Sequence, residues 1–170
     1  MPPASPQQLA ISQAGPVDQV FALTNSETST ISYPGHVAPI PGTTLEIDLA
    51  NASLLIITYS MRVYLVQQAG TTIYGPPGPI MLVRCEFDGK SCAPNGNDQE
   101  FGNNLGWGDA RSFTWVVHKA KKGAHTVAIL GGLANPNNVQ AYVTNRSLVV
   151  QAARLRGGLK IQTTVEGRRA

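Results

Sequence analysis

The chain has 170 residues and a net charge of +3, and only 14% of its residues are charged, compared with about 25% in an average soluble domain. This length suits one domain whose core is stable without a disulfide or a metal. Gly (17) and Pro (12) are frequent and apolar stripes at helical spacing are absent, which favours short strands over helices. No run of about 18 apolar residues occurs, so no insertion into a membrane is predicted.

The first 16 residues are rich in proline and contain an adjacent pair of glutamines, a composition typical of an extended arm. They lack the basic and apolar regions of a secretory signal. A first strand is expected at 17–23, followed by short β pieces at 30–33 and 36–40. The N-terminal arm (1–16) is therefore expected to lead directly into a β domain.

The clearest pattern lies between residues 43 and 68. TTLEIDL alternates apolar and acidic residues, as a half-buried strand does, and a turn follows at 50–52. The next strand, 53–68, begins with a run that is apolar on both faces, and the opposing sheet of a sandwich covers only one of them. An arm, a loop or a neighbouring subunit must cover the other. We favour a subunit, and the predicted interface residues are Leu54, Ile56 and Tyr64.

The only two cysteines flank an Asp-Gly pair in the segment CEFDGKSC. A two-residue turn at Asp88-Gly89 would place Cys85 opposite Cys92, at a Cα separation of about 5.5 Å that a disulfide tolerates. In a reducing compartment the same residues would be two small core side chains, and the sequence leaves both states open. No metal is predicted here, because two cysteines without a further His or Cys do not complete a tetrahedral set.

The second half of the chain opens on a long polar loop, 93–109, which follows a strand ending at CEF. Further strands are expected at 110–120 and 124–133. The segments 139–144 and 145–155 are expected to finish the sheet, either as two strands or as one long bent strand, and 159–165 is a candidate for one more strand beyond the main body. The later strands are thus separated by short turns of the kind that join antiparallel neighbours.

About eight to ten short antiparallel strands with turns between them predict an all-β sandwich or barrel rather than a βαβ fold. The expected domain spans 17–154, between the N-terminal arm and a basic C-terminal extension, 155–170. No aromatic residues interleave with the basic ones, so nucleic acid is not an expected partner. The basic residues that crowd the last part of the chain are Arg154, Arg156, Lys160, Arg168 and Arg169.

Several pieces of the sequence resemble the TNF/C1q-like jelly roll, in its short bacterial and phage versions, over residues 28–154. They are IPGTTLEIDL, LLIITYSMRV, VRCEFDGK, and RSFTWVV followed by KKGAHTVAI and VTNRSLVV. The resemblance implies a jelly-roll β-sandwich and a homotrimer packed along flat apolar sheet faces. It also implies that the protein acts by binding or by building shells, because the shared motifs are structural and not catalytic.

The polar loop 93–109 is the predicted surface for contact with a ligand or partner, because loops carry function disproportionately. It holds a tryptophan between glycines, which either stacks on a sugar or partner or plugs the end of the sandwich. The predicted contact residues in this loop are Asn95, Asn97, Asp98, Asn103, Asn104 and Trp107.

No motif for catalysis, metal binding or cofactor binding occurs, so no catalytic residue, metal or cofactor is predicted. Among the three histidines, His125 is expected to be held by a turn or by hydrogen bonds to the backbone. The leading hypothesis is a non-enzymatic homotrimeric structural protein of a virion surface, either a capsid decoration or a fibre component, with itself and a protein shell as partners. The alternatives are a carbohydrate- or receptor-binding module and a cupin-like sandwich enzyme.

This hypothesis places the protein in the virion, or in the cytoplasm before assembly. The protein would be secreted if a signal peptide has been removed from it.

Overall fold

The computed structural model describes residues 14–32, 37–67, 79–94, 99–102, 108–134 and 139–155. These residues form β-strands and no helix, so none of their segments is a helix that could cross a membrane. The strands are β1 (Ala14–Asn25), β2 (Ser29–Ile31), β3 (Ala38–Leu49), β4 (Ser53–Gln67), β5 (Ile80–Phe87), β6 (Lys90–Ser91), β7 (Gln99–Gly102), β8 (Gly108–Ala120), β9 (Gly123–Ala134) and β10 (Val139–Leu155).

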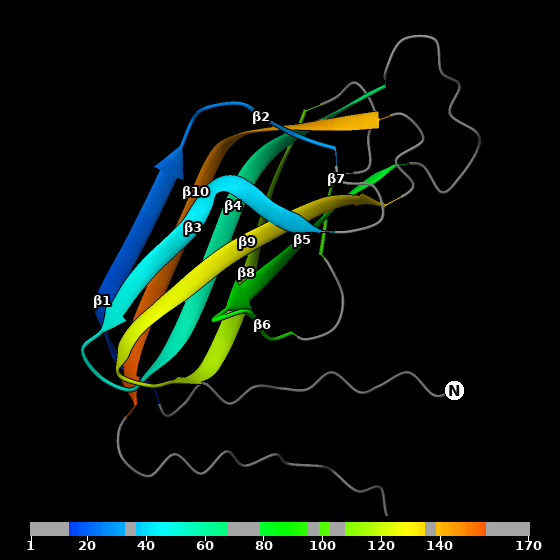
Figure 1. Ribbon diagram of the computed structural model, residues 1–170. Coiled ribbons are helices and arrows are strands. Elements are labelled where there is room, and N and C mark those ends of the chain that lie inside the picture. Colours follow the sequence, from blue (N-terminus) through cyan, green and yellow to red (C-terminus); the bar gives the residue numbers. More distant parts are fainter. Residues whose placement is uncertain are drawn as a thin grey trace, which may run out of the picture.

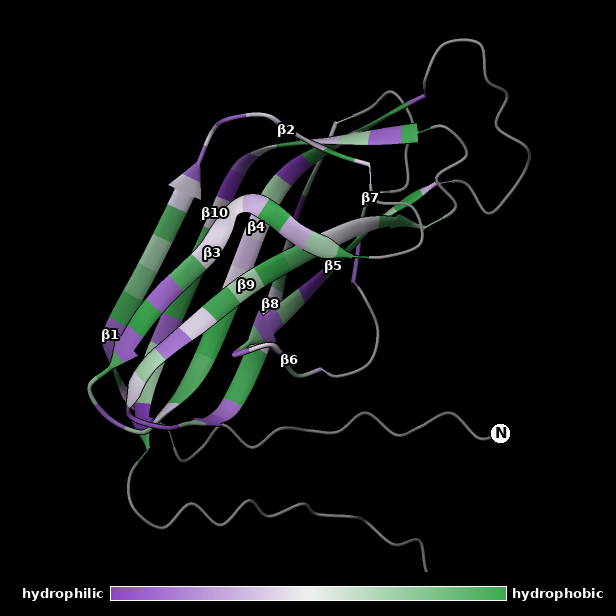
Figure 2. Ribbon diagram, in the orientation of Figure 1, coloured by the Kyte–Doolittle hydropathy of each residue, from purple (hydrophilic) through white to green (hydrophobic). Residues whose placement is uncertain are grey.

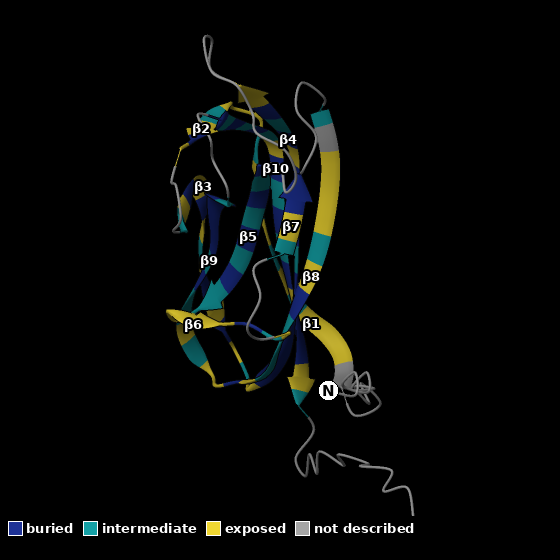
Figure 3. Cartoon of the chain, turned by 90° about the vertical axis from the view of Figure 1, so that its right-hand side faces the viewer, coloured by how far each residue is buried: buried dark blue, intermediate teal, exposed yellow. Residues whose placement is uncertain are grey.

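The strands form two antiparallel sheets that pack face to face (Figures 1 and 3). The first sheet has the order β1-β10-β4-β8, with β2 also paired to β10. The second sheet has the order β3-β9-β5-β6, with β7 also paired to β5. After β2 the chain passes repeatedly from one sheet to the other, which is the connectivity of a jelly roll. The predicted all-β jelly-roll sandwich is confirmed. Residues 14–16 of the expected N-terminal arm belong to β1 and Leu155 of the expected C-terminal extension ends β10, whereas the rest of both arms lies outside the described residues.

The core lies between the two sheets and follows from the alternation of side chains along each strand. In the first sheet, Val150, Ile57 and Trp115 are cross-strand neighbours on β10, β4 and β8, and each is at most 2% exposed. In the second sheet, Cys85 of β5 lies opposite Ile129 of β9, and both are fully buried. Figure 2 shows the same alternation of hydrophobic and hydrophilic residues along β3. The two inner faces thus build one continuous apolar layer.

The β5–β6 hairpin turns at Asp88 and Gly89, whose φ angles of 50° and 71° lie in the left-handed region. A two-residue hairpin turn with both central residues at positive φ favours Asp-Gly, because glycine has no Cβ to clash there. The predicted turn is therefore present with the predicted register. The cross-strand pairs beside the turn are Phe87 with Lys90 and Glu86 with Ser91.

Strand β10 is one long strand, one of the two predicted alternatives, and a bulge interrupts its pairing with β4 between Thr144 and Ser147. Asn145 has a φ of 49° at this point, a conformation that asparagine tolerates better than most residues. The next residue, Arg146, is only 3% exposed. The bulge thus coincides with a buried arginine in the first sheet.

The structure corrects the prediction that residues 93–109 form a polar loop. Residues Gln99–Gly102 form strand β7, which pairs with β5, and β8 already begins at Gly108. Phe101 of β7 is 1% exposed, and its ring centroid lies 5.9 Å from that of Tyr59. A single apolar residue among polar ones gives no two-residue periodicity, so only the tertiary pairing reveals this strand. The strand expected at 159–165 lies outside the described residues.

Candidate functional site

The residues predicted to contact a ligand lie outside the described part of the chain, so their role stays a prediction. They are Asn95, Asn97, Asp98, Asn103, Asn104 and Trp107.

The three predicted interface residues all lie on β4 and share its outward side, because their neighbours Leu55 and Ile57 point into the core. Leu54 is only 7% exposed within a single chain, so the expectation that it lacks internal cover is wrong. Ile56 and Tyr64 are half-buried and remain accessible. Of the three predicted interface residues, only Ile56 and Tyr64 are therefore accessible to a partner. The role of β4 as an interface stays a prediction.

The outer side of the first sheet is more extensive than these positions, and it includes four cross-strand rows whose paired residues are uncharged. The rows are set by the register of β1, β10, β4 and β8, and Arg62 follows the fourth row on β4. Exposed Asp18 lies on β1 between the first two rows, and Leu54 and Ala153 of the first row are buried. We call these residues the uncharged face. They are Val17, Ala153 and Leu54; Val20, Gln151, Ile56 and Val116; Ala22, Val149, Thr58 and Thr114; and Thr24, Ser147, Ser60 and Ser112.

The outer side of the second sheet has a different character. Its strands alternate core residues with charged ones, as expected of a sheet with one face in water. The charged residues on this side are Glu46 and Asp48 of β3, Arg84 and Glu86 of β5, and Glu100 of β7. The charge of the sandwich is thus distributed unevenly between its two faces.

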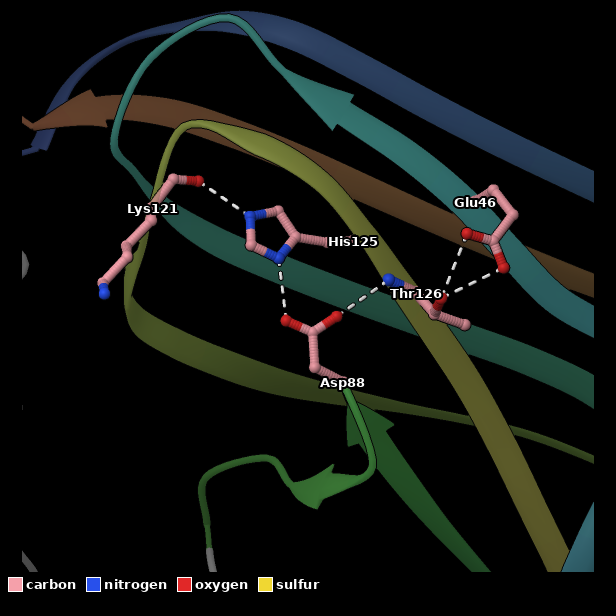
Figure 4. Close-up of polar contacts among 5 residues, drawn as sticks. All are labelled: Glu46, Asp88, Lys121, His125 and Thr126. Atoms are coloured by element: carbon pink, nitrogen blue, oxygen red, sulfur yellow. Dashed lines mark hydrogen bonds and ion pairs between the residues drawn. The ribbon is translucent and has the colours of Figure 1, made fainter.

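A polar cluster joins the tip of the β5–β6 hairpin to strand β9 (Figure 4). The carboxylate of Asp88 accepts a hydrogen bond from the backbone N–H of Thr126 at 3.0 Å and lies 2.8 Å from Nδ1 of His125. The Nε2 atom of His125 lies 2.8 Å from the carbonyl oxygen of Lys121. The hydroxyl of Thr126 donates to the carboxylate of Glu46. The expectation that His125 is held by hydrogen bonds to the backbone is confirmed.

The partners of His125 determine its charge. A carboxylate and a carbonyl oxygen are both acceptors, so both ring nitrogens donate only when the ring is a charged imidazolium. Burial lowers the pKa of His125, but the hydrogen bonds to Asp88 and Lys121 outweigh this and raise it above its usual value of 6.5. Burial raises the pKa of Asp88, but the hydrogen bonds from Thr126 and His125 and nearby positive charge lower it below its usual value of 3.8. Both shifts favour the charged form of the group, so Asp88 and His125 form an ion pair whenever the imidazole carries its second proton.

This geometry favours a structural clamp over a catalytic pair. A general-base histidine needs its second ring nitrogen directed at a nucleophile, whereas Nε2 of His125 is occupied by a backbone carbonyl. In the segments that the structure describes, no group of three or more His, Cys, Asp and Glu side chains could hold a metal ion. The cluster fixes the hairpin, and it presents no reacting group.

The clamp predicts a pH-dependent stability that Asp88→Asn should remove. The contribution of His125 is complete below its unfolded-state pKa and is lost as pH rises through the higher folded-state value. That of Asp88 is lost as pH falls through its own lowered value. We expect the melting temperature of the wild type to exceed that of Asp88→Asn by about 2 °C near pH 5.5, and by less near pH 9. Glu100→Gln should keep the wild-type pH profile, and a constant difference from pH 5 to 9 would contradict the clamp.

The two cysteines lie together as the hairpin register requires. Both are buried, and their Sγ atoms are 3.2 Å apart with the thiols reduced. The backbone N–H of Cys92 donates to the carbonyl of Cys85 at 3.0 Å. The hydrogen bond between the thiols, followed by burial, raises the pKa of Cys85. The disulfide stays a prediction, but the two sulfur atoms that it would join already lie side by side.

No protein-family model matches the chain, and no curated protein sequence does either. Among solved structures, the chain is similar to chains from infectious bursal disease virus strains Gt and Gx, with a TM-score of 0.50 in both cases and identities of 13% and 14%. These matches cover 85% and 84% of this chain but only 35% and 34% of the viral chains. This chain therefore spans about a third of the length of the viral chains.

The VP2 subviral particle of the same virus is similar with a TM-score of 0.45 and 11% identity, over 84% of this chain and 39% of that one. What the Gt and Gx chains share with this protein is the fold. At identities this low, the likeness extends to the β-sandwich and not to a site.

Proposed function

We propose that the protein is a non-enzymatic structural component of a virion, a homotrimer that decorates a capsid or forms part of a fibre. The observation that carries the proposal is the uncharged face of the first sheet. Apolar residues that are exposed together on one face favour cover by another protein. Val17 and Val20 are 46% and 59% exposed on this face, whereas the second sheet of the same sandwich has the usual charged exterior. A face of this kind favours cover by another protein surface.

Three further observations support the proposal. The sandwich is similar to chains of a virus, which supports a place in a virion. The sequence resemblance to the TNF/C1q-like jelly roll supports three-fold assembly, and membership of that family stays a prediction. The polar cluster around His125 supports a structural protein, because its groups satisfy one another and leave no nucleophile or open ligand position.

Size-exclusion chromatography with light scattering tests the homotrimer. At micromolar concentration we expect a particle of three times the 18.0 kDa chain mass. The mass should be unchanged by a reducing agent, because the assembly rests on apolar contact and not on intermolecular disulfides. A single species at the mass of one chain would contradict the proposal.

A further inference from the structure

We propose that the outer side of the first sheet holds a binding site for a saccharide that carries a carboxylate. The site is formed by Arg62 and Tyr64 of β4, Gly108 of β8, and Gln140 and Tyr142 of β10. We call these residues the tyrosine–arginine patch. The patch lies past the fourth row of the uncharged face, and binding there does not depend on the association of copies, so the inference goes beyond the proposed function.

The register places two tyrosines next to each other on the two central strands of the first sheet. Tyr142 of β10 and Tyr64 of β4 are cross-strand partners, and Gly108 of β8 continues the same row. Residues directly opposite one another have Cβ atoms about 5 Å apart on the same side of a sheet. Both tyrosines are half-buried, whereas the residues before and after each of them in the strand are buried. The two side chains therefore stand on the outward side, and both are partly accessible.

The guanidinium of Arg62 is held in place by the Tyr64 ring. Its Cζ atom lies 4.9 Å from the ring centroid, and the arginine is exposed. Both side chains lean over Gly108, where an added Cβ would collide with the Tyr64 ring and lie 2.9 Å from Nε of Arg62. A guanidinium stacked on a ring keeps its in-plane N–H groups directed to the sides. Arg62 is therefore oriented before a ligand arrives, which reduces the conformational entropy lost on binding.

Neutral polar groups lie beside the Tyr142 ring. The Tyr142 hydroxyl donates to Oε1 of Gln140 at 3.2 Å, and Gln140 is two positions away on the same side of β10. A hydroxyl that donates still has lone pairs with which to accept, and the Gln140 amide also has N–H groups that can donate. The patch thus combines an aromatic ring with a donor, an acceptor and a fixed cation.

An acidic saccharide matches this combination of groups. The C–H groups on one face of a sugar ring pack against the electron-rich face of an aromatic ring, here Tyr142, and the sugar hydroxyls pair with neutral donors and acceptors. A carboxylate on the sugar accepts two parallel hydrogen bonds from the guanidinium of Arg62.

The charge of the patch argues against two larger partners. Among the residues that the register places in the rows of Arg62 and Tyr64, Arg62 alone is cationic. A nucleic-acid strand needs a series of cations along its backbone. A protein seated on the patch would bury the charge of Arg62, which is costly without a counter-charge. One cation therefore suits a small ligand with one carboxylate at this position.

Ligand-observed saturation-transfer NMR with matched probes tests the inference. The acidic probes are sialyllactose and trigalacturonic acid, and their neutral counterparts are lactose and the methyl ester of trigalacturonic acid. We expect at least one acidic probe to bind with a Kd of about 1 mM, the affinity of a few contacts in an open site. Its neutral counterpart should bind about tenfold more weakly, because it lacks the carboxylate. Binding of neither acidic probe, or equal binding of the neutral counterpart, would overturn the inference.

Substitutions in the patch locate the site. Arg62→Gln and Tyr142→Ala should each weaken binding of the acidic probe about tenfold. Gly108→Ala removes no functional group but displaces both Arg62 and Tyr64, so it should weaken binding as much. Tyr142→Phe keeps the ring and should bind within about threefold of the wild type. Arg154→Gln is the matched control, because it makes the same change at an exposed position on the same sheet, and it should bind like the wild type.

Melting curves of the isolated variants separate a loss of binding from a loss of structure. Folded Arg62→Gln and Tyr142→Ala proteins that bind the acidic probe like the wild type would overturn the inference. Tighter binding of a single-stranded oligothymidylate than of either acidic probe would overturn it too, in favour of a nucleic-acid platform. Light scattering on the same samples tests the proposed function separately. A monomer that binds the acidic probe would refute the homotrimer and support this site.

Discussion

Replacing Arg146 by alanine is expected to lower the free energy of unfolding by about 3 kcal/mol. The guanidinium is 3% exposed and donates to the hydroxyl of Ser29 at 2.7 Å and to the carbonyl of Glu27 at 2.8 Å. These bonds fasten the connection between β1 and β2 onto β10, next to the β10 bulge. Truncation leaves the Glu27 carbonyl without this donor and opens a cavity where the buried side chain lay.

Two further variants separate the charge from the packing. Among the described residues, Arg146 has no carboxylate partner, and its Nε atom makes no hydrogen bond. Arg146→Met keeps most of the volume and removes the buried charge, so we expect a loss of only about 1 kcal/mol. Arg146→Lys keeps the charge but lacks the fork that reaches Ser29 and Glu27 together, so its loss should resemble that of alanine.

Urea unfolding followed by tryptophan fluorescence measures these differences, at one fixed protein concentration because self-association adds to the apparent stability. Arg154→Ala is the matched control, since Arg154 is exposed on the same strand and should change stability by less than about 0.5 kcal/mol. An Arg146→Ala protein as stable as the control would show that the buried guanidinium contributes nothing to the fold.

Oxidation of Cys85 and Cys92 to a disulfide is expected to stabilise the domain by about 2.5 kcal/mol, the loop-closure value for a short loop. Their Sγ atoms lie 3.2 Å apart, so bond formation needs a movement of only about 1 Å. Because both thiols are buried, a dissolved oxidant reaches them poorly and the folded protein should oxidise slowly. Refolding in an oxidising buffer should form the bond efficiently.

The intact mass, which falls by two hydrogens on oxidation, identifies the bonded form. Its urea midpoint should exceed that of the reduced protein, and a reducing agent should abolish the difference. Cys92→Ser cannot form the bond and should respond to neither treatment. A bonded protein with the midpoint of the reduced one would show that strain in the native hairpin cancels the loop-closure gain.

By itself the sequence determined the local elements. The alternation in TTLEIDL and RSFTWVV defined two strands, and Asp88-Gly89 defined a hairpin turn and its register, because these signals depend on side-chain periodicity and on the φ angles of a few adjacent residues. The same local signals predicted an all-β sandwich.

Four other features depend on the tertiary structure. β7 exists because β5 offers its edge to a stretch with a single large apolar residue, Phe101. His125 and Asp88 meet because the hairpin and β9 lie side by side, although 37 positions separate them in the chain. Leu54 is covered within one copy, and the uncharged face arises only when four strands distant in sequence align their outward residues in register. Side chains brought together by pairing between distant strands leave no periodic signal in the chain, so the sequence could not reveal them.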